Sequence, residues 1–398
     1  MPGLRCVGSA LLGVVLTACQ TPVPPSAAPT ASPAPVSSPV AISSPSPTAL
    51  PSLPAQTAAH LKWTKAKTNL PPRVAHGGLH IAMRPDGSPR YAGVDAFNEV
   101  LLSDDGVTWQ IIKAAAAPGP WTIDVALFGD QLVAFDRDLD YMSLDQDGQY
   151  AVLSDGRTWL TTDGREWSRH PSPFAFVSSA LDGDRLVATG GVSGDYVPTF
   201  ATSTDASTWT LEPQAAGQWS GDASCWWNVS HLAGSSTDGF VVSGYQTGPF
   251  GAECGRGPAA DTTIWRSTDL RSWAPTLKPS GPCYRVYDIV HGPRGFVAVG
   301  AVPTGVGRLQ AGCAWASRDG IAWALATTPP PVVTSGVEQL ALAPDGTFLA
   351  FGDEIWESTD GVQWFLSAPA TTFYVYQVAG DLAVGCADDT CYALRAAP

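Results

Sequence analysis

The sequence predicts an all-β protein, a β-propeller of repeated four-stranded blades, and the main reason is a seven-residue motif. The motif Ser/Thr-x-Asp-x-x-x-Trp occurs six times. Its aspartates recur about every 51 residues, which is the length of one four-stranded propeller blade. They are Asp105, Asp163, Asp205, Asp269, Asp319 and Asp360.

Apolar runs upstream of the motif give the second reason. Runs rich in Val and Phe, often ending in glycine, stand at 186–190, 240–244, 296–300 and 348–352. Such near-continuous apolar runs are typical of strands buried on both faces. Four motif copies also carry a tryptophan two residues before the Ser/Thr, namely Trp159, Trp265, Trp315 and Trp356. Ten of the fifteen tryptophans therefore belong to the repeat framework.

Each residue of the motif has a structural task in a tight hairpin. The Asp carboxylate can accept hydrogen bonds from N–H groups of the turn, and the glycine that often follows it permits a positive φ. We expect the Trp to start the fourth strand and to pack its ring on the next blade. The six aspartates are therefore predicted to be framework residues and not catalysts.

The third observation is a seventh repeat that lacks its last strand. After Trp364, apolar runs at 374–379, 382–385 and 391–394 supply three strands. The fourth is expected from 61–67, so that one N-terminal and three C-terminal strands close the ring and leave no open sheet edge. We therefore predict seven blades, with six as the alternative.

The N-terminal region has the features of an exported lipoprotein. Residues 1–18 contain Arg5 and an apolar run that is too short to span a membrane. Small residues precede Cys19, the expected lipidation site; the alternative is an ordinary signal peptide with a chance cysteine. Residues 19–59 are rich in Pro, Ser and Ala and predict a disordered tether. The propeller would occupy 60–398, outside the cytoplasm and anchored to a bacterial membrane.

Charge and cysteine content restrict the partners. The formal net charge of −14 disfavours nucleic acid and anionic lipid surfaces as partners. No cofactor and no metal is expected, and the protein is predicted to be a monomer. Six cysteines in an exported domain favour disulfides. The repeat register favours the pairs Cys225–Cys254, Cys283–Cys313 and Cys386–Cys391. Metal binding is the rival interpretation, but the chain has no Cys-x-x-Cys motif.

The six motifs resemble Asp-boxes, also called BNR repeats, of sialidases, sortilin-like receptors and a photosystem assembly factor. The resemblance covers the whole predicted propeller and implies a fold rather than an activity. One feature departs from it: Asp and Trp are four residues apart here, whereas the usual Asp-box has five.

Sialidase chemistry would require three arginines, a Tyr–Glu pair, an Asp acid and a Phe/Tyr-Arg-Ile-Pro motif. The segment 71–75 reads Pro-Pro-Arg-Val-Ala and does not match that motif. Arginines in predicted connecting loops form no recognisable triad; they are Arg137, Arg256, Arg285 and Arg308.

The face opposite the motif turns is the predicted ligand face, because the longest connections gather there. A Gly- and aromatic-rich surface, braced by Cys225–Cys254, supplies the candidate ligand contacts Trp219, Trp226, Trp227, Tyr245, Phe250 and Glu253. The alternative for Trp226 and Trp227 is that they start an inner strand and pack in the core.

Two further clusters contain residue types that bind metal ions. The loop that contains Asp136, Asp138, Asp140, Asp145 and Asp147 is interpreted as a solvated acidic loop, because Tyr141 stands where a calcium loop requires glycine. On a strand, His76 and His80 would lie about 13 Å apart, too far for one metal.

These observations favour a non-catalytic binding or scaffold module for a glycan, a peptide or a partner protein. The first alternative is a glycoside hydrolase, sialidase-like with a divergent site, which needs two carboxylates about 5–9.5 Å apart. The second is an assembly factor for a membrane complex, by analogy only.

Overall fold

The structure is a computed structural model. It describes residues 58–73, 79–84, 88–95, 97, 99–114, 116, 118, 122–137, 156–191, 197–216, 218–219, 226–247, 262–279, 283, 285–304, 308–328, 339–352, 354–368, 374–387 and 389–397. The predicted signal peptide, Cys19, nearly all of the tether, Cys225, Cys254, Phe250, Glu253, His76 and most of the acidic loop lie outside these residues. No helix among the described segments is long and apolar enough to cross a membrane.

Seven antiparallel four-stranded sheets, the blades, follow one another along the chain. Blade 1 contains β2 (His80–Met83), β3 (Tyr91–Val94), β4 (Glu99–Ser103) and β5 (Gln110–Lys113). Blade 2 contains β6 (Thr122–Phe128), β7 (Gln131–Arg137), β8 (Gly156–Thr161) and β9 (Ser168–Pro171). Blade 3 contains β10 (Ala175–Asp182), β11 (Arg185–Gly191), β12 (Pro198–Ser203) and β13 (Thr210–Glu212).

The remaining four blades repeat this arrangement. Blade 4 contains β14 (Trp226–Ser235), β15 (Gly239–Thr247), β16 (Thr263–Ser267) and β17 (Ala274–Leu277). Blade 5 contains β18 (Arg285–Gly292), β19 (Gly295–Thr304), β20 (Arg308–Ser317) and β21 (Ala324–Leu325). Blade 6 contains β22 (Gln339–Leu342), β23 (Phe348–Phe351), β24 (Ile355–Ser358) and β25 (Phe365–Ala368). Blade 7 contains β26 (Tyr374–Ala379), β27 (Leu382–Ala387), β28 (Thr390–Ala397) and β1 (Lys62–Lys67).

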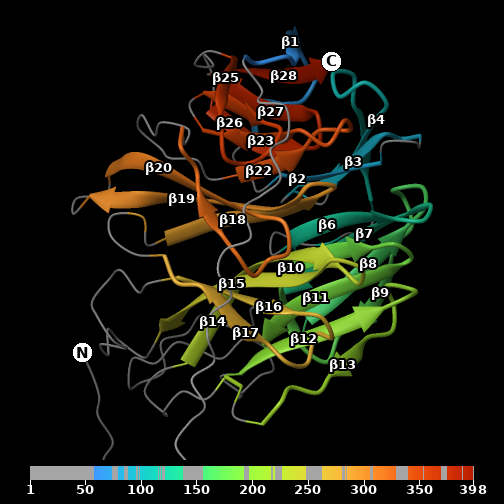
Figure 1. Ribbon diagram of the computed structural model, residues 1–398. Coiled ribbons are helices and arrows are strands. Elements are labelled where there is room, and N and C mark those ends of the chain that lie inside the picture. The colour runs from blue at the N-terminus through green and yellow to red at the C-terminus, as the bar shows by residue number, and fades with distance from the viewer. Residues whose placement is uncertain are drawn as a thin grey trace, which may run out of the picture. The chain divides into compact units, whose positions relative to one another are not determined.

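Blade 7 is closed by the N-terminal strand. Figure 1 shows β1 beside β28, and the two pair antiparallel from Lys62 opposite Ala397 to Lys67 opposite Tyr392. The first strands of the blades contact one another in order, and the first strand of blade 7 contacts that of blade 1. The predicted seven-bladed propeller and its closure are confirmed, and the six-bladed alternative is wrong.

The six motif turns share one hydrogen-bond pattern. Each motif aspartate accepts hydrogen bonds through Oδ1 from the N–H groups two and three residues further on, at 2.7–3.1 Å. The motif Ser or Thr hydroxyl contacts the same carboxylate, as Ser103 does at 3.0 Å from Asp105. The residue after the aspartate has φ between 58° and 75°, including Ala206 and Leu270, which replace the usual glycine. These turns therefore tolerate a left-handed non-glycine residue at two of six positions.

The motif tryptophans pack on the preceding blade, not on the next one. Trp109 of blade 1 is buried with Leu382 and Val384 of blade 7, and Trp364 of blade 6 with Val297 and Val299 of blade 5. Each motif tryptophan also stands directly before the fourth strand instead of starting it. The direction follows from the turn, because a Cβ on the neighbouring Gly106 or Gly361 would likewise meet the preceding blade.

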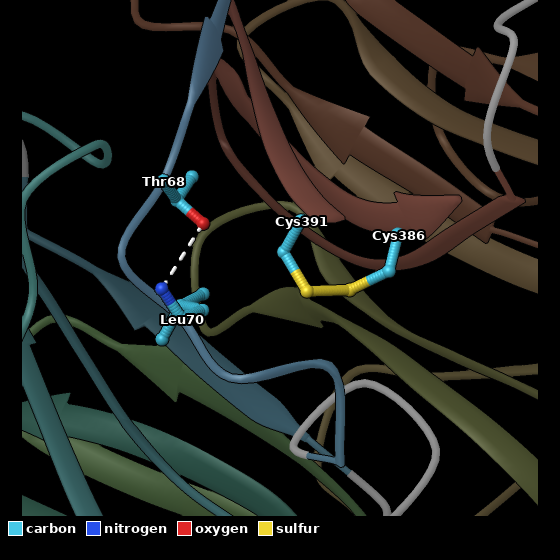
Figure 2. The surroundings of a disulfide bond; sticks show 4 residues. All are labelled: Thr68, Leu70, Cys386 and Cys391. Carbon is cyan, nitrogen blue, oxygen red and sulfur yellow. Dashed lines mark hydrogen bonds between the residues drawn. A yellow bond between two sulfur atoms is a disulfide. The ribbon is translucent and has the colours of Figure 1, made fainter. Parts of the chain in front are cut away.

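Two of the three predicted disulfides lie within the described residues. Cys283 bonds to Cys313 in blade 5, and Cys386 bonds to Cys391 across the β27–β28 hairpin. Figure 2 shows the second bond beside the segment from Thr68 to Leu70, where the Leu70 N–H donates to the Thr68 hydroxyl. Leu70 shares a buried cluster with both cysteines. Disulfides indicate an extracytoplasmic location, because cytosolic thiols are kept reduced.

The motif aspartates are expected to make the protein acid-sensitive. Burial alone would raise the pKa of Asp205, but hydrogen bonds from the Thr208 and Ser207 N–H groups outweigh it and hold the pKa at about 2. The pKa is also lowered at Asp105, Asp163, Asp269 and Asp319. A lowered folded-state pKa stabilises the fold above the unfolded value of about 3.9, and that stabilisation is lost as the pH falls through the folded value.

Asp205→Asn should therefore flatten the decline in the free energy of unfolding between about pH 4 and pH 2. Urea unfolding at a series of pH values measures this, with Asp130→Asn, an exposed carboxylate outside the motif, as the control. An unchanged slope in Asp205→Asn would contradict the role of its carboxylate.

Candidate functional site

Polar residues interrupt the innermost strands at one register position, which we call the channel ring. In each of blades 1 to 6, one residue of the second strand pairs with the motif Ser or Thr of the third strand. The second-strand residue three positions later pairs with a residue of the first strand, and that first-strand residue belongs to the channel ring. The ring consists of His80, Asp124, Ser178, His231, Asp288 and Gln339. In blades 2 to 5 it directly follows a β-bulge.

Three ring side chains link consecutive blades. Asp124 accepts hydrogen bonds from the Ser179 N–H at 3.3 Å and the Ser179 hydroxyl at 2.6 Å. In the same way, the Ser178 hydroxyl accepts from the Leu232 N–H at 3.1 Å. An innermost strand has no partner strand on its channel side, so its N–H groups that face the channel need other hydrogen-bond acceptors. The ring supplies them.

Asp288 makes the corresponding link between blades 5 and 6. Its Oδ2 accepts from the Leu340 N–H at 2.7 Å, and its Oδ1 accepts from the Ile289 N–H at 2.8 Å. The Nδ1 atom of His231, in blade 4, lies 3.4 Å from the same Oδ1. Asp288 therefore connects three consecutive blades at the channel.

The ring residues of blades 2 to 5 line a pocket of about 280 Å³. The lining side chains come from β6, β10, β14 and β18. They are Ile123, Asp124, Val177, Ser178, Ser179, Ser230, His231, Leu232, Asp288 and Ile289. The pocket thus combines two carboxylates, one imidazole and three hydroxyls with four aliphatic side chains, and its described lining contains no lysine or arginine.

Burial and a neighbouring charge affect the pKa of the Asp124 carboxyl. Burial raises the pKa of Asp124, hydrogen bonds from Ser179 and Val125 oppose the shift, and the negative charge of Asp288 adds to it. At the neighbouring ring position in blade 1, burial lowers the pKa of His80, so its imidazole is neutral at pH 7. No group of three or more His, Cys, Asp or Glu side chains among the described residues could hold a metal ion.

Three aromatic residues proposed from the sequence, Trp219, Trp227 and Tyr245, are not among the residues that line this pocket. Trp219 is 3% exposed, and its ring lies 5.1 Å from that of Trp265 and 6.1 Å from that of Phe200. It is therefore a core residue between blades 3 and 4, with no free ring face. Trp227 is half-buried, and its ring packs edge-on against Trp265 at 4.5 Å.

Tyr245 lies on β15 and is engaged by a neighbouring strand. It is half-buried and pairs with Asn228, whose side-chain amide donates to the Tyr245 hydroxyl at 3.2 Å. Trp226 begins β14, as the alternative of an inner strand start predicted. Its side chain lies outside the described residues, so its predicted packing in the core is untested.

The placement of the arginines in connecting loops is wrong at three positions, because Arg137 ends β7, Arg285 begins β18 and Arg308 begins β20. Arg256 lies outside the described residues.

Comparisons with known proteins bear on the fold alone. No protein-family model matches the chain, and neither does any curated protein sequence. Among solved structures, virginiamycin B lyase from Staphylococcus aureus is similar with a TM-score of 0.54 at 8% identity, covering 84% of this chain and 99% of the lyase. YCF48 from Cyanidioschyzon merolae is similar with a TM-score of 0.50 at 13% identity, covering 85% and 99%.

A streptogramin B lyase gives a TM-score of 0.52 at 9% identity, covering 85% of this chain and 98% of the lyase. The fold is therefore shared with proteins of different activities, and at such low identity no residue role can be transferred.

The channel ring was missed in the sequence, although a signal was present. Asp124 stands in Thr-Ile-Asp-Val-Ala-Leu-Phe and Asp288 in Arg-Val-Tyr-Asp-Ile-Val. A carboxylate within an apolar strand is rare unless it is paired. Alignment on the motif Ser or Thr does not place both in one register, because Asp124 lies 37 residues before Thr161 and Asp288 lies 29 residues before Ser317.

Proposed function

We propose that the protein is a lipid-anchored, extracytoplasmic binding module that holds a small polar group of a glycan, peptide or partner protein in the channel pocket. One observation carries the proposal: backbone N–H groups already fix both pocket carboxylates, from within their strands and from the next blade. Polar groups held before the ligand arrives reduce the entropy lost on binding.

A glycoside hydrolase is the second candidate. Asp124, with its raised pKa, and Asp288 line one pocket, and two carboxylates in unlike environments are what glycosidic chemistry uses. The three hydrogen bonds that Asp124 accepts restrict it as a proton donor. A sialidase-like activity is disfavoured further, because a substrate carboxylate would be repelled where no lining arginine clamps it. The assembly-factor hypothesis rests on the fold alone.

Filling the pocket tests the proposal. Ser230 lines the pocket and is half-buried, whereas Ser168 is exposed on the outer strand β9. On glycan and peptide arrays, the mature chain should retain a ligand that it leaves chemically intact. Ser230→Phe should weaken that binding at least tenfold, and Ser168→Phe should not.

Equal binding by both variants would place the ligand elsewhere and contradict the proposal. Turnover of a glycoside that Asp124→Asn abolishes would replace it by the hydrolase.

A further inference from the structure

The pocket carboxylates of Asp124 and Asp288 differ from those of Asp381 and Asp182, each of which is held by an arginine. Asp381 lies 2.6 Å from Arg90, and Asp182 lies 2.6 Å from Arg185. Asp124 and Asp288 instead accept from backbone N–H groups and a serine hydroxyl, which orient a carboxylate without neutralising its charge.

Among the described lining residues, His231 is the one that can carry a positive charge. Its Nδ1 is 3.4 Å from Asp288, a long contact that offsets at most one charge and only when the imidazole is protonated. The whole chain carries a formal net charge of −14, so the surrounding protein adds to the negative potential. Charge complementarity in the pocket must therefore come from the ligand.

The other lining groups indicate what accompanies that charge. Ser178, Ser179 and Ser230 contribute hydroxyls, which both donate and accept, whereas Leu232 and Ile289 are buried in the core. A volume of about 280 Å³ lies at the lower end of ligand pockets and suits one sugar-sized unit. Such a mixture matches a polyhydroxylated ring better than the long aliphatic stem of a lysine.

We infer that the pocket takes a sugar unit that carries a primary ammonium group, placed between the carboxylates of Asp124 and Asp288. The inference rests on the proposed function and specifies its ligand class. The ammonium group would donate to the acceptor sites that the backbone leaves open, and the hydroxyls of the ring would meet the serines. Acidic sugars are excluded by the same charges.

The test compares glucosamine oligomers with N-acetylglucosamine oligomers of equal length by calorimetry, using the full mature chain. The two differ in whether the nitrogen is charged. Glucosamine oligomers should bind at least tenfold more tightly, and the advantage should shrink as salt is added.

Ser230→Lys supplies an internal cation and leaves both aspartates in place. It should abolish the preference for the charged oligomer, whereas Ser168→Lys on the outer strand should preserve it. Asp288→Asn should reduce glucosamine binding about tenfold relative to Asp184→Asn, an exposed carboxylate outside the pocket. Thermal unfolding of each variant confirms that it is folded.

Each outcome decides a different point. Equal or tighter binding of the N-acetylated oligomer, sensitive to Ser230→Phe, would overturn the inference and leave the proposed function intact. Tighter binding of a lysine-containing peptide than of the amino sugar would overturn the assignment to a sugar. Binding that no pocket variant changes would overturn both.

Discussion

A chain that begins at residue 68 is expected to be about 5 kcal/mol less stable than one that begins at residue 58. The shorter chain lacks β1 and so leaves blade 7 with three strands. It loses the burial of Leu61, worth about 2 kcal/mol, and the contacts of His60 and Leu61 with the buried Glu357 carboxylate, worth about 3 kcal/mol.

Glu357 is the reason for the larger contribution. Its side chain is fully buried and accepts hydrogen bonds from the His60 and Leu61 N–H groups, with His60 Nδ1 at 2.7 Å. The Ser367 hydroxyl also donates to it. The carboxylate in blade 6 thus fixes the segment that leads into β1, and removal of that segment leaves a buried charge with fewer partners.

Urea unfolding and size-exclusion chromatography measure the effect. The shorter chain should also self-associate, because β28 becomes an unpaired edge. Adding a peptide of residues 58–67 should restore stability and reduce the self-association, whereas a scrambled peptide should not. Equal stability of the two chains would show that β1 contributes little to the closure.

The architecture could be predicted because its determinants are local and repeated. Asp105 and its five equivalents each shape one turn through hydrogen bonds to residues two and three positions away. Closure by β1 could be predicted as well, since an unpaired edge strand is unfavourable and 61–67 is the segment left over. The packing direction of Trp109 could not, because the motif alone does not show which neighbouring blade the turn faces.

The candidate site could not be predicted for two physical reasons. Asp124, His231 and Asp288 are far apart in the sequence and meet only because the innermost strands surround one channel. Bulges then shift the register at each of them, so strand alternation does not reveal which way they point. Trp219 shows the converse error: an aromatic residue in a Gly-rich segment suggests a surface, but here its ring fills the space between two blades.

Gly190→Ala is expected to destabilise the protein by about 3 kcal/mol, and Gly191→Ala is not. A Cβ on Gly190 would lie 1.8 Å from the Ala175 carbonyl oxygen, whereas no heavy atom lies within 4 Å of a Cβ on Gly191. Neither glycine has a left-handed φ, so the contrast is purely steric. Gly191→Ala should even add about 0.5 kcal/mol by restricting the unfolded chain.

The same close approach recurs where the innermost strands bulge. A Cβ on Gly300 would lie 1.8 Å from the Arg285 carbonyl oxygen, and one on Gly244 would lie 2.6 Å from that of Asn228. These glycines stand beside the bulges that place the channel ring, so Gly190→Ala should displace Ser178 as well as lower stability. If Gly190→Ala no longer binds the ligand at temperatures where it is still folded, the bulge positions the channel ring for binding. Wild-type binding by the folded variant would show that the bulge does not affect the pocket.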